Sequence, residues 1–154
     1  MEDLKLVISP SPHVRDTDTT EGIMVAVLIS LIPVLAAAVY FFGFSAIRLV
    51  LLGGATAVAT EAVFQKLRNK PITVWDGSAL VTGVLLALTV PPTLPSWMII
   101  VGSVVAIVIG KQVFGGLGHN IFNPALVGRA FLTASFVGSM TAWTGPFDTI
   151  TRAT

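Results

Sequence analysis

Long uncharged stretches dominate the chain. No Asp, Glu, Lys or Arg occurs in residues 22–47, 49–60, 77–110, 112–128 or 130–147. A helix needs about 20 predominantly apolar residues to cross the hydrocarbon core of a bilayer. The pattern therefore predicts an all-α protein, a polytopic membrane helix bundle. A soluble protein with buried core helices is disfavoured, because so few charged side chains would remain to cover a surface in water.

Two spans of ordinary length are expected first. Residues 22–44 form the first span, with Pro33 inside it, and residues 46–64 form the second. Neighbouring helices in a membrane can satisfy the carbonyl that a proline frees. The Gly-Gly pair at 53–54 predicts that the second span packs closely against another helix. Residues 1–21 read as an arm outside the membrane, because a Ser-Pro-Ser-Pro run precludes a regular helix there.

The 34 uncharged residues 77–110 are too few for two ordinary spans and a turn, which need more than about 40 residues. A proline-rich run at 91–95 divides this stretch into residues 77–90 and 97–114. The first part has 14 residues, about 21 Å of helix. At least one of these segments is therefore expected to be short.

A second short segment, residues 124–140, follows a glycine-rich loop. Asn123 is its expected N-cap and Pro124 its first helical residue. Discontinuous helices of channels and transporters aim free N–H groups and positive dipole ends at a ligand within the membrane. Two short, tilted spans would give the same sequence pattern, so both interpretations stay open.

Three basic residues, Lys66, Arg68 and Lys70, lie in one short loop and predict that this loop is cytoplasmic. Two preceding spans place the N-terminal arm on the same side. Residues 22–140 would then hold about five spans, two of them short. If all of them cross, the tail 141–154 emerges on the outer face; a re-entrant short segment would change that outcome.

Composition agrees with a membrane protein and excludes several site types. The chain is 54% hydrophobic and 11% charged, with a mean hydropathy of +0.87, whereas a soluble domain carries about 25% charged residues. The chain has no cysteine, which excludes cysteine-ligated iron–sulfur clusters and disulfides within it. No basic patch for nucleic acid and no catalytic triad is present, so no catalytic residue is predicted.

Ionisable residues at membrane depth are functional candidates, and the sequence offers Glu61 and Arg129. Glu61 either helps to bind a coupling ion or lies close enough to the interface to snorkel or to pair with Lys66. Arg129 either has a functional role or locks two helices together. A haem or metal site would need both histidines, His13 and His119, from distant segments, so no metal is expected. His119 is expected to satisfy polar groups of the glycine-rich loop.

The last seven residues have the form D-x-x-[ST]-x-A-T, with Asp148, Thr151 and Thr154 at the defining positions. This motif resembles the acceptor of a bacterial flavin transferase, which joins FMN to the final threonine through a phosphoester. A threonine hydroxyl on an exposed segment can attack the pyrophosphate of FAD and release AMP. Arg152 stands where the usual motif has glycine, and it either pairs with the flavin phosphate or crowds the loop.

Three further stretches resemble the D subunit of the bacterial Rnf complex, which is related to the B subunit of the sodium-pumping NADH:quinone reductase. They are SPSPHVR at 9–15, DGSALVTG at 76–83 running on through Pro91-Pro92, and GGLGHNIFNPALVGRAFL at 115–132. The resemblance implies covalent FMN on Thr154 and a second, non-covalent flavin (riboflavin) nearby, whose contacts the sequence does not place.

The same resemblance implies a membrane subunit of a ferredoxin:NAD oxidoreductase that moves Na⁺ or H⁺ across the bacterial inner membrane, a translocase rather than an enzyme acting alone. Its implied partners are the other Rnf subunits, including a second flavin-bearing subunit and integral membrane subunits, together with the flavin transferase and lipid. Nucleic acid is not among them.

The implied fold resembles urea channels, which are built from inverted repeats with half-helices, and this chain would supply about one repeat. Because family members are about twice as long, the chain is expected to represent the N-terminal half. A urea-channel-like solute channel without a redox role, and a purely structural subunit, remain alternative functions.

Overall fold

The computed structural model describes residues 19–69 and 73–147. This part of the chain is helical and contains no strand, which confirms the all-α prediction. Its elements are α1 (Thr20–Phe42), α2 (Phe44–Leu67), the 3₁₀ helix η1 (Val74–Asp76), α3 (Ser78–Leu88), α4 (Ser96–Ile107), the π-helix η2 (Val108–Gln112), α5 (Pro124–Ser135) and α6 (Val137–Thr141). Two of these helices, α1 and α2, are long and apolar enough to cross a membrane.

Helix α1 begins at a side-chain cap and ends at a glycine. The Thr19 hydroxyl accepts a hydrogen bond from the backbone N–H of Gly22 at 3.1 Å, which satisfies one of the free N–H groups of the first turn. Gly43 separates α1 from α2 with φ +58°, a conformation that glycine adopts at little cost. The break therefore falls at Gly43, slightly earlier than the boundary of 44–46 that the hydrophobic pattern suggested.

The predicted short segment at 77–90 is the 11-residue helix α3, about 16 Å long. Gly77 is the N-cap residue of this helix. Asp76 Oδ1 accepts hydrogen bonds from the Ser78 backbone N–H at 2.9 Å and from the Ser78 hydroxyl at 2.6 Å, and so satisfies the first N–H of the helix. Helix α4 continues directly into the π-turn η2, so one helical rod covers Ser96–Gln112.

The second short segment is interrupted, although residues 124–140 were predicted as a single helix. Phe136 leaves helical geometry at φ −134° and ψ 53°, and it divides the segment into α5 and the five-residue α6. The start of α5 agrees with the prediction: Asn123 Oδ1 accepts from the Ala125 N–H at 3.0 Å, and Pro124 is the first residue of the helix.

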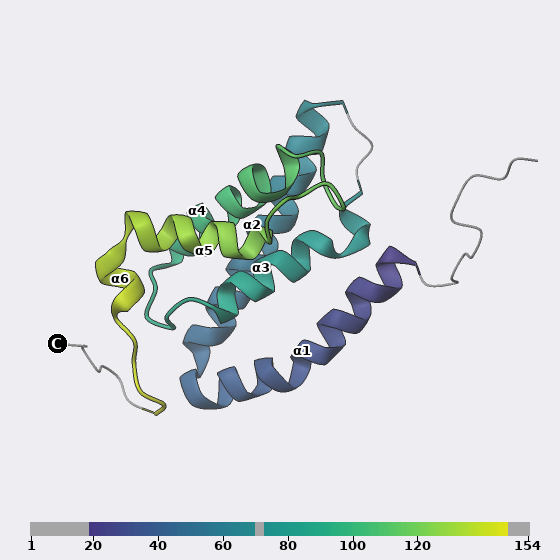
Figure 1. Ribbon diagram of the computed structural model, residues 1–154. Coiled ribbons are helices and arrows are strands. Elements are labelled where there is room, and N and C mark those ends of the chain that lie inside the picture. Colours follow the sequence, from purple (N-terminus) through teal and green to yellow (C-terminus); the bar gives the residue numbers. More distant parts are fainter. Residues whose placement is uncertain (1–18, 70–72, 148–154) are drawn as a thin grey trace, which may run out of the picture.

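Helix α2 is the centre of the bundle, packed against α3 and α4, and α5 packs on the other side of α4 (Figure 1). The core contains Leu49, Leu86, Leu94, Ile99 and Leu132, none more than 2% exposed. Helix α1 has no buried residue. It runs along one side of the bundle in Figure 1.

Glycines allow the closest helix crossings. A Cβ at Gly83 of α3 would overlap the carbonyl oxygen of Gly53 in α2. A Cβ at Gly128 of α5 would lie 2.7 Å from the carbonyl oxygen of Gly102 in α4. Backbones approach this closely only where side chains are absent, so the predicted role of the Gly53–Gly54 pair in helix packing is confirmed.

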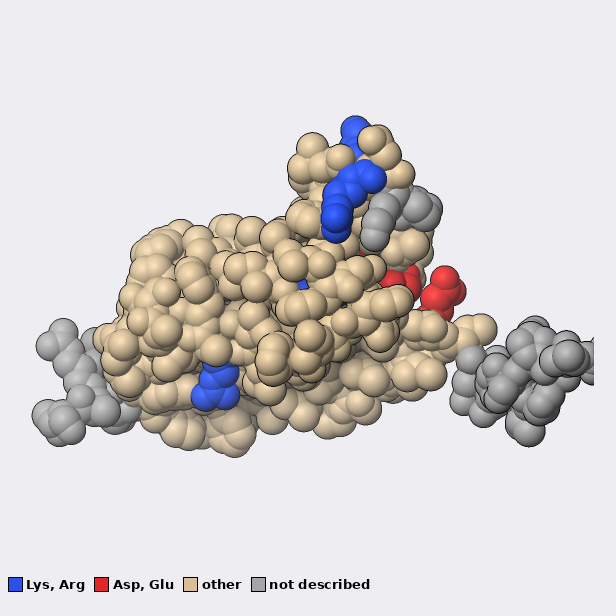
Figure 2. Space-filling model, turned by 45° about the horizontal axis from the view of Figure 1, so that its top comes forward, with Lys and Arg blue, Asp and Glu red and all other residues tan. Residues whose placement is uncertain are grey.

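The last described residues lie beside the α1–α2 junction. The Phe147 N–H donates to the Phe41 carbonyl at 3.3 Å, and the Phe147 ring packs edge-on against Tyr40 and Phe41 with centroids 5.4 Å apart. Lys66 and Arg68 lie at the far end of α2. Figure 2 shows Lys and Arg side chains together on a projecting lobe of the surface.

Candidate functional site

Glu61 of α2 is the centre of a buried polar cluster. Its side chain is 1% exposed, and its Oε1 accepts from Lys111 Nζ at 2.6 Å, from Gln112 Nε2 at 2.7 Å and from Gln65 Nε2 at 3.3 Å. Of the alternatives for Glu61, pairing with Lys66 is wrong, because Lys66 is exposed to solvent and Lys111 is the partner. Glu61 therefore faces the bundle interior and does not snorkel.

Lys111 comes from the π-turn η2 and is 2% exposed. Besides Glu61, its ammonium donates to the Ser78 hydroxyl at 2.5 Å, and that hydroxyl donates to Asp76 Oδ1. Desolvating two charges is expensive, and a buried pair persists only where further hydrogen bonds support it. The cluster supplies such support on both sides of the ammonium. Single π-turns in helices are frequent at functional sites.

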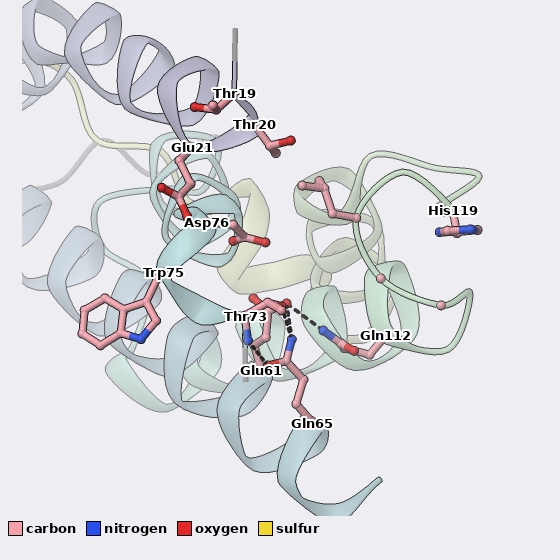
Figure 3. A pocket seen from close by; sticks show the side chains of 13 residues that line it. Thr19, Thr20, Glu21, Glu61, Gln65, Thr73, Trp75, Asp76, Gln112 and His119 are labelled. Atoms are coloured by element: carbon pink, nitrogen blue, oxygen red, sulfur yellow. Dashed lines mark hydrogen bonds between the residues drawn. The ribbon is translucent and has the colours of Figure 1, made fainter. Parts of the chain in front are cut away.

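Gln65 is oriented by a reciprocal pair of hydrogen bonds. The Thr73 N–H donates to Gln65 Oε1 at 2.9 Å, and Gln65 Nε2 donates to Thr73 Oγ1 at 2.9 Å. These two bonds fix which end of the Gln65 amide is the oxygen and which is the NH₂ group. The NH₂ group also donates to Glu61 Oε1, as Figure 3 shows. The second half of α2 is thereby tied to the segment that leads into α3.

A cavity of about 810 Å³ lies against this cluster. Its lining includes Glu21, Glu61 and Asp76, which are all the acidic residues in the described part of the chain, and no Lys or Arg of that part lines it. Glu61 Oε2 is buried and has no hydrogen-bond partner among the described residues. Walls of one charge sign concentrate counter-ions, so this cavity favours cations. Within residues 19–69 and 73–147, no three His or acidic side chains are placed to hold a metal ion together.

A second cavity of about 270 Å³ is lined by the starts of both short helices, Ser78 of α3 and Asn123–Pro124 of α5, and by Lys111. The two helix starts that the sequence singled out, more than 40 residues apart, therefore meet at one place. This meeting is the arrangement expected for discontinuous helices around an interior site.

The other ionisable candidates lie outside the cluster. Arg129 is exposed on α5 and makes no ion pair or side-chain hydrogen bond with a described residue. His119 is exposed on the glycine-rich loop at the edge of the larger cavity, and its backbone N–H donates to the Gly116 carbonyl at 3.1 Å. Figure 3 shows its ring apart from the Glu61 cluster. His13 lies outside the described residues.

The three residues of the predicted flavin motif, Asp148, Thr151 and Thr154, also lie outside the described residues. The structure describes the chain up to Phe147, beside Phe41. The predicted arm likewise enters the described part only at Thr19.

The sequence pattern did not single out Lys111 or the two glutamines, Gln65 and Gln112. A signal for Lys111 was available, since it is the single charged residue between Asp76 and Arg129. A lone charge in such a stretch is a functional candidate. The glutamines gave no such signal, because an amide near a helix end is ordinary until its partner is known.

Comparison with known proteins identifies relatives along nearly the whole chain. The sequence model of the "NQR2, RnfD, RnfE family" matches residues 7–154. The D subunit of the Na⁺-translocating ferredoxin:NAD⁺ oxidoreductase complex of Acetobacterium woodii is 54% identical over 156 residues, covering 100% of this chain and 49% of the relative.

Two further relatives show the same partial coverage. The D subunit of the proton-translocating ferredoxin:NAD⁺ oxidoreductase complex of Clostridium ljungdahlii is 45% identical over 151 residues, covering 96% of this chain and 46% of the relative. The D subunit of the ion-translocating oxidoreductase complex of Escherichia fergusonii is 43% identical over 143 residues, covering 92% and 41%. The chain thus spans about half the length of the curated relatives that it matches.

Proposed function

Since the chain belongs to the NQR2, RnfD, RnfE family, we propose that it acts as a membrane subunit of an ion-translocating redox complex of the ferredoxin:NAD oxidoreductase type. The names of its relatives support this function, as they are D subunits of such complexes. The two long apolar helices support a place in the membrane. Its partners would be the other subunits of that complex, including a second flavin-bearing subunit and integral membrane subunits, in a bacterial inner membrane.

The observation that carries the ion-translocating part is the acidic cavity. It gathers every described carboxylate, including the buried Glu61, against a membrane-type helix bundle. A buried carboxylate with an unpartnered oxygen destabilises the fold, and such a residue within a membrane is a functional candidate. We assign Glu61 to the path of the translocated cation, Na⁺ or H⁺.

The electron-transfer part rests on Thr154. A flavin transferase would attach FMN to its hydroxyl, with Asp148 and Thr151 as recognition residues. The bound flavin supplies the one- and two-electron chemistry, and the protein supplies its position and surroundings. The tail leaves the described structure beside Phe41, at the opposite end of α2 from Lys66 and Arg68. This geometry supports a flavin on the outer face if the basic end of α2 is cytoplasmic.

The attachment is tested by coexpressing the full-length gene with its flavin transferase and imaging flavin fluorescence on a denaturing gel. The wild-type band should fluoresce, Thr154→Ala should lose the signal, and Thr149→Ala, a change at a variable motif position, should keep it. Fluorescence that survives in Thr154→Ala would remove the assignment of Thr154.

The ion path is tested with the whole complex in liposomes. Glu61→Gln should reduce cation uptake coupled to electron transfer at least tenfold, whereas Lys66→Gln, an exposed change in the same helix, should not. Flux of a small neutral solute in the absence of partner subunits and flavin would instead favour the alternative, a urea-channel-like channel. The cavity of about 810 Å³ is the structural feature that suggests this alternative.

A further inference from the structure

The Glu61–Lys111 ion pair lies between the two cavities. Glu61 lines the larger cavity, Lys111 and Ser78 line the smaller one, and Leu117 lines both. The carboxylate and the ammonium are 2.6 Å apart, and each residue is at most 2% exposed. Part of the boundary between the cavities is therefore a single salt bridge.

The charges in this boundary do not balance. The hydrogen-bonded cluster holds two carboxylates, Glu61 and Asp76, and one ammonium, Lys111. Glu21 adds a third carboxylate at the wall of the larger cavity. Within residues 19–69 and 73–147, all three donors to Glu61 reach Oε1, and the buried Oε2 has none. The cluster thus has a carboxylate oxygen without a donor. Its two carboxylates and one ammonium leave a net negative charge that one more monovalent cation would balance.

Lys111 has a second set of partners that does not include Glu61. Its ammonium already donates to the Ser78 hydroxyl, which is bonded to Asp76. A lysine carries its charge on a flexible four-carbon stem, so a small movement can exchange one carboxylate for the other without a change of protonation. An ammonium that moves away from Glu61 therefore still has a counter-charge, the Asp76 carboxylate.

From this arrangement we propose that Lys111 is a tethered competitor for an alkali-metal cation at Glu61. The cation enters the larger cavity, binds Glu61 through Oε2 and displaces the ammonium toward Ser78 and Asp76. With the salt bridge open, the two cavities join, and the cation reaches the chamber at the starts of α3 and α5. The proposal rests on the proposed ion-translocating function and adds a gate to it.

The competition is tested in the full-length protein within its complex, with Na⁺ as the probe. If Lys111 leaves Glu61 in about one molecule in ten, removing its charge raises the apparent cation affinity about tenfold. Lys111→Met should therefore lower the Na⁺ concentration for half-maximal electron transfer about tenfold. The exposed Lys66→Met is the matched control and should leave it unchanged. A half-saturating concentration within twofold of wild type in Lys111→Met would overturn the competition.

A second experiment leaves Lys111 in place, in case its replacement prevents folding. Thr82 lines the smaller cavity but not the larger one, and the 154 residues contain no cysteine. Thr82→Cys should react with a small cationic methanethiosulfonate at least fivefold faster in NaCl than in choline chloride of equal ionic strength, scored at this residue by mass spectrometry. Equal rates in the two salts would overturn the gate.

The two proposals fail in different ways. Absence of covalent flavin and of cation-dependent electron transfer in the wild type would overturn the proposed function. Normal flavin, normal Na⁺-dependent electron transfer and no effect of Lys111→Met or of Na⁺ on Cys labelling would overturn only the role of Lys111.

Discussion

Gly83 is the position where the smallest change should have the largest structural effect. An alanine Cβ there would overlap the Gly53 carbonyl oxygen and lie 2.7 Å from both the Gly53 carbonyl carbon and the Gly54 Cα. Real Cβ atoms essentially never come within 3.0 Å of such atoms, so each contact is too short by 0.3 Å or more. All three atoms belong to the backbone, which cannot rotate away. Gly83→Ala must therefore push α3 and α2 apart.

The expected loss is about 2–3 kcal/mol, toward the upper end of what one added methyl causes in a packed core. The same separation should disturb the Glu61 cluster, because Glu61 belongs to α2 and Ser78 to α3. Lys111 bridges these two residues through its single ammonium. We therefore expect Gly83→Ala to lower both thermal stability and Na⁺-dependent electron transfer.

The assay is thermal unfolding of the purified complex that contains the full-length subunit, in detergent. It is followed by fluorescence-detected size exclusion, and electron transfer is measured on the same preparation. Gly138→Ala in α6 is the matched control. Its Cβ would meet no described atom within 4 Å, so it should be neutral or stabilise by up to about 1 kcal/mol. A Gly83→Ala protein with wild-type stability would show that α2 and α3 do not cross at this distance.

Three other changes follow from the same structure. Lys111→Met should destabilise the protein by about 3–5 kcal/mol in the absence of Na⁺, because it leaves the Glu61 carboxylate buried without its counter-charge. Adding Glu61→Gln should recover much of that loss. Additive losses of stability in this double-mutant cycle would argue against the ion pair. Asn123→Ala should lower stability by about 1 kcal/mol through loss of the α5 cap, and an unchanged melting temperature would refute that cap. Asp76→Ala removes the acceptor of two Ser78 hydrogen bonds and should destabilise by about 1–2 kcal/mol, checked by the same melting assay.

Much of the local structure followed from the sequence. The uncharged stretches predicted α1 and α2, and the proline-rich run predicted that the next helix would be short. Asn123 and Pro124 marked the start of α5 to the residue. These features depend on neighbours within a few positions, which one sequence displays directly. The interruption at Phe136 was missed, because an aromatic residue among apolar ones gives no local sign of a break.

The site was only partly predictable. Glu61 was selected correctly as an ionisable residue at depth, but the one partner considered for it was the nearest lysine in sequence. Lys66 is little more than one turn along α2, yet that direction leads to solvent. Lys111 is 50 residues away and reaches Glu61 only because α4 and η2 pack against α2. The flavin motif rests on the sequence alone.

The sequence by itself determined that this protein is a helical membrane protein of a particular family, since composition, hydrophobic run length and motif order are properties of the chain. Only the tertiary structure decided that Glu21, Glu61 and Asp76 line one cavity, and that Lys111 stands between it and a second one. The physical reason is that helix formation is set locally. The meeting of charges that are 15 or more residues apart is set by which helix faces pack together, and here glycine contacts between α2 and α3 fix that packing.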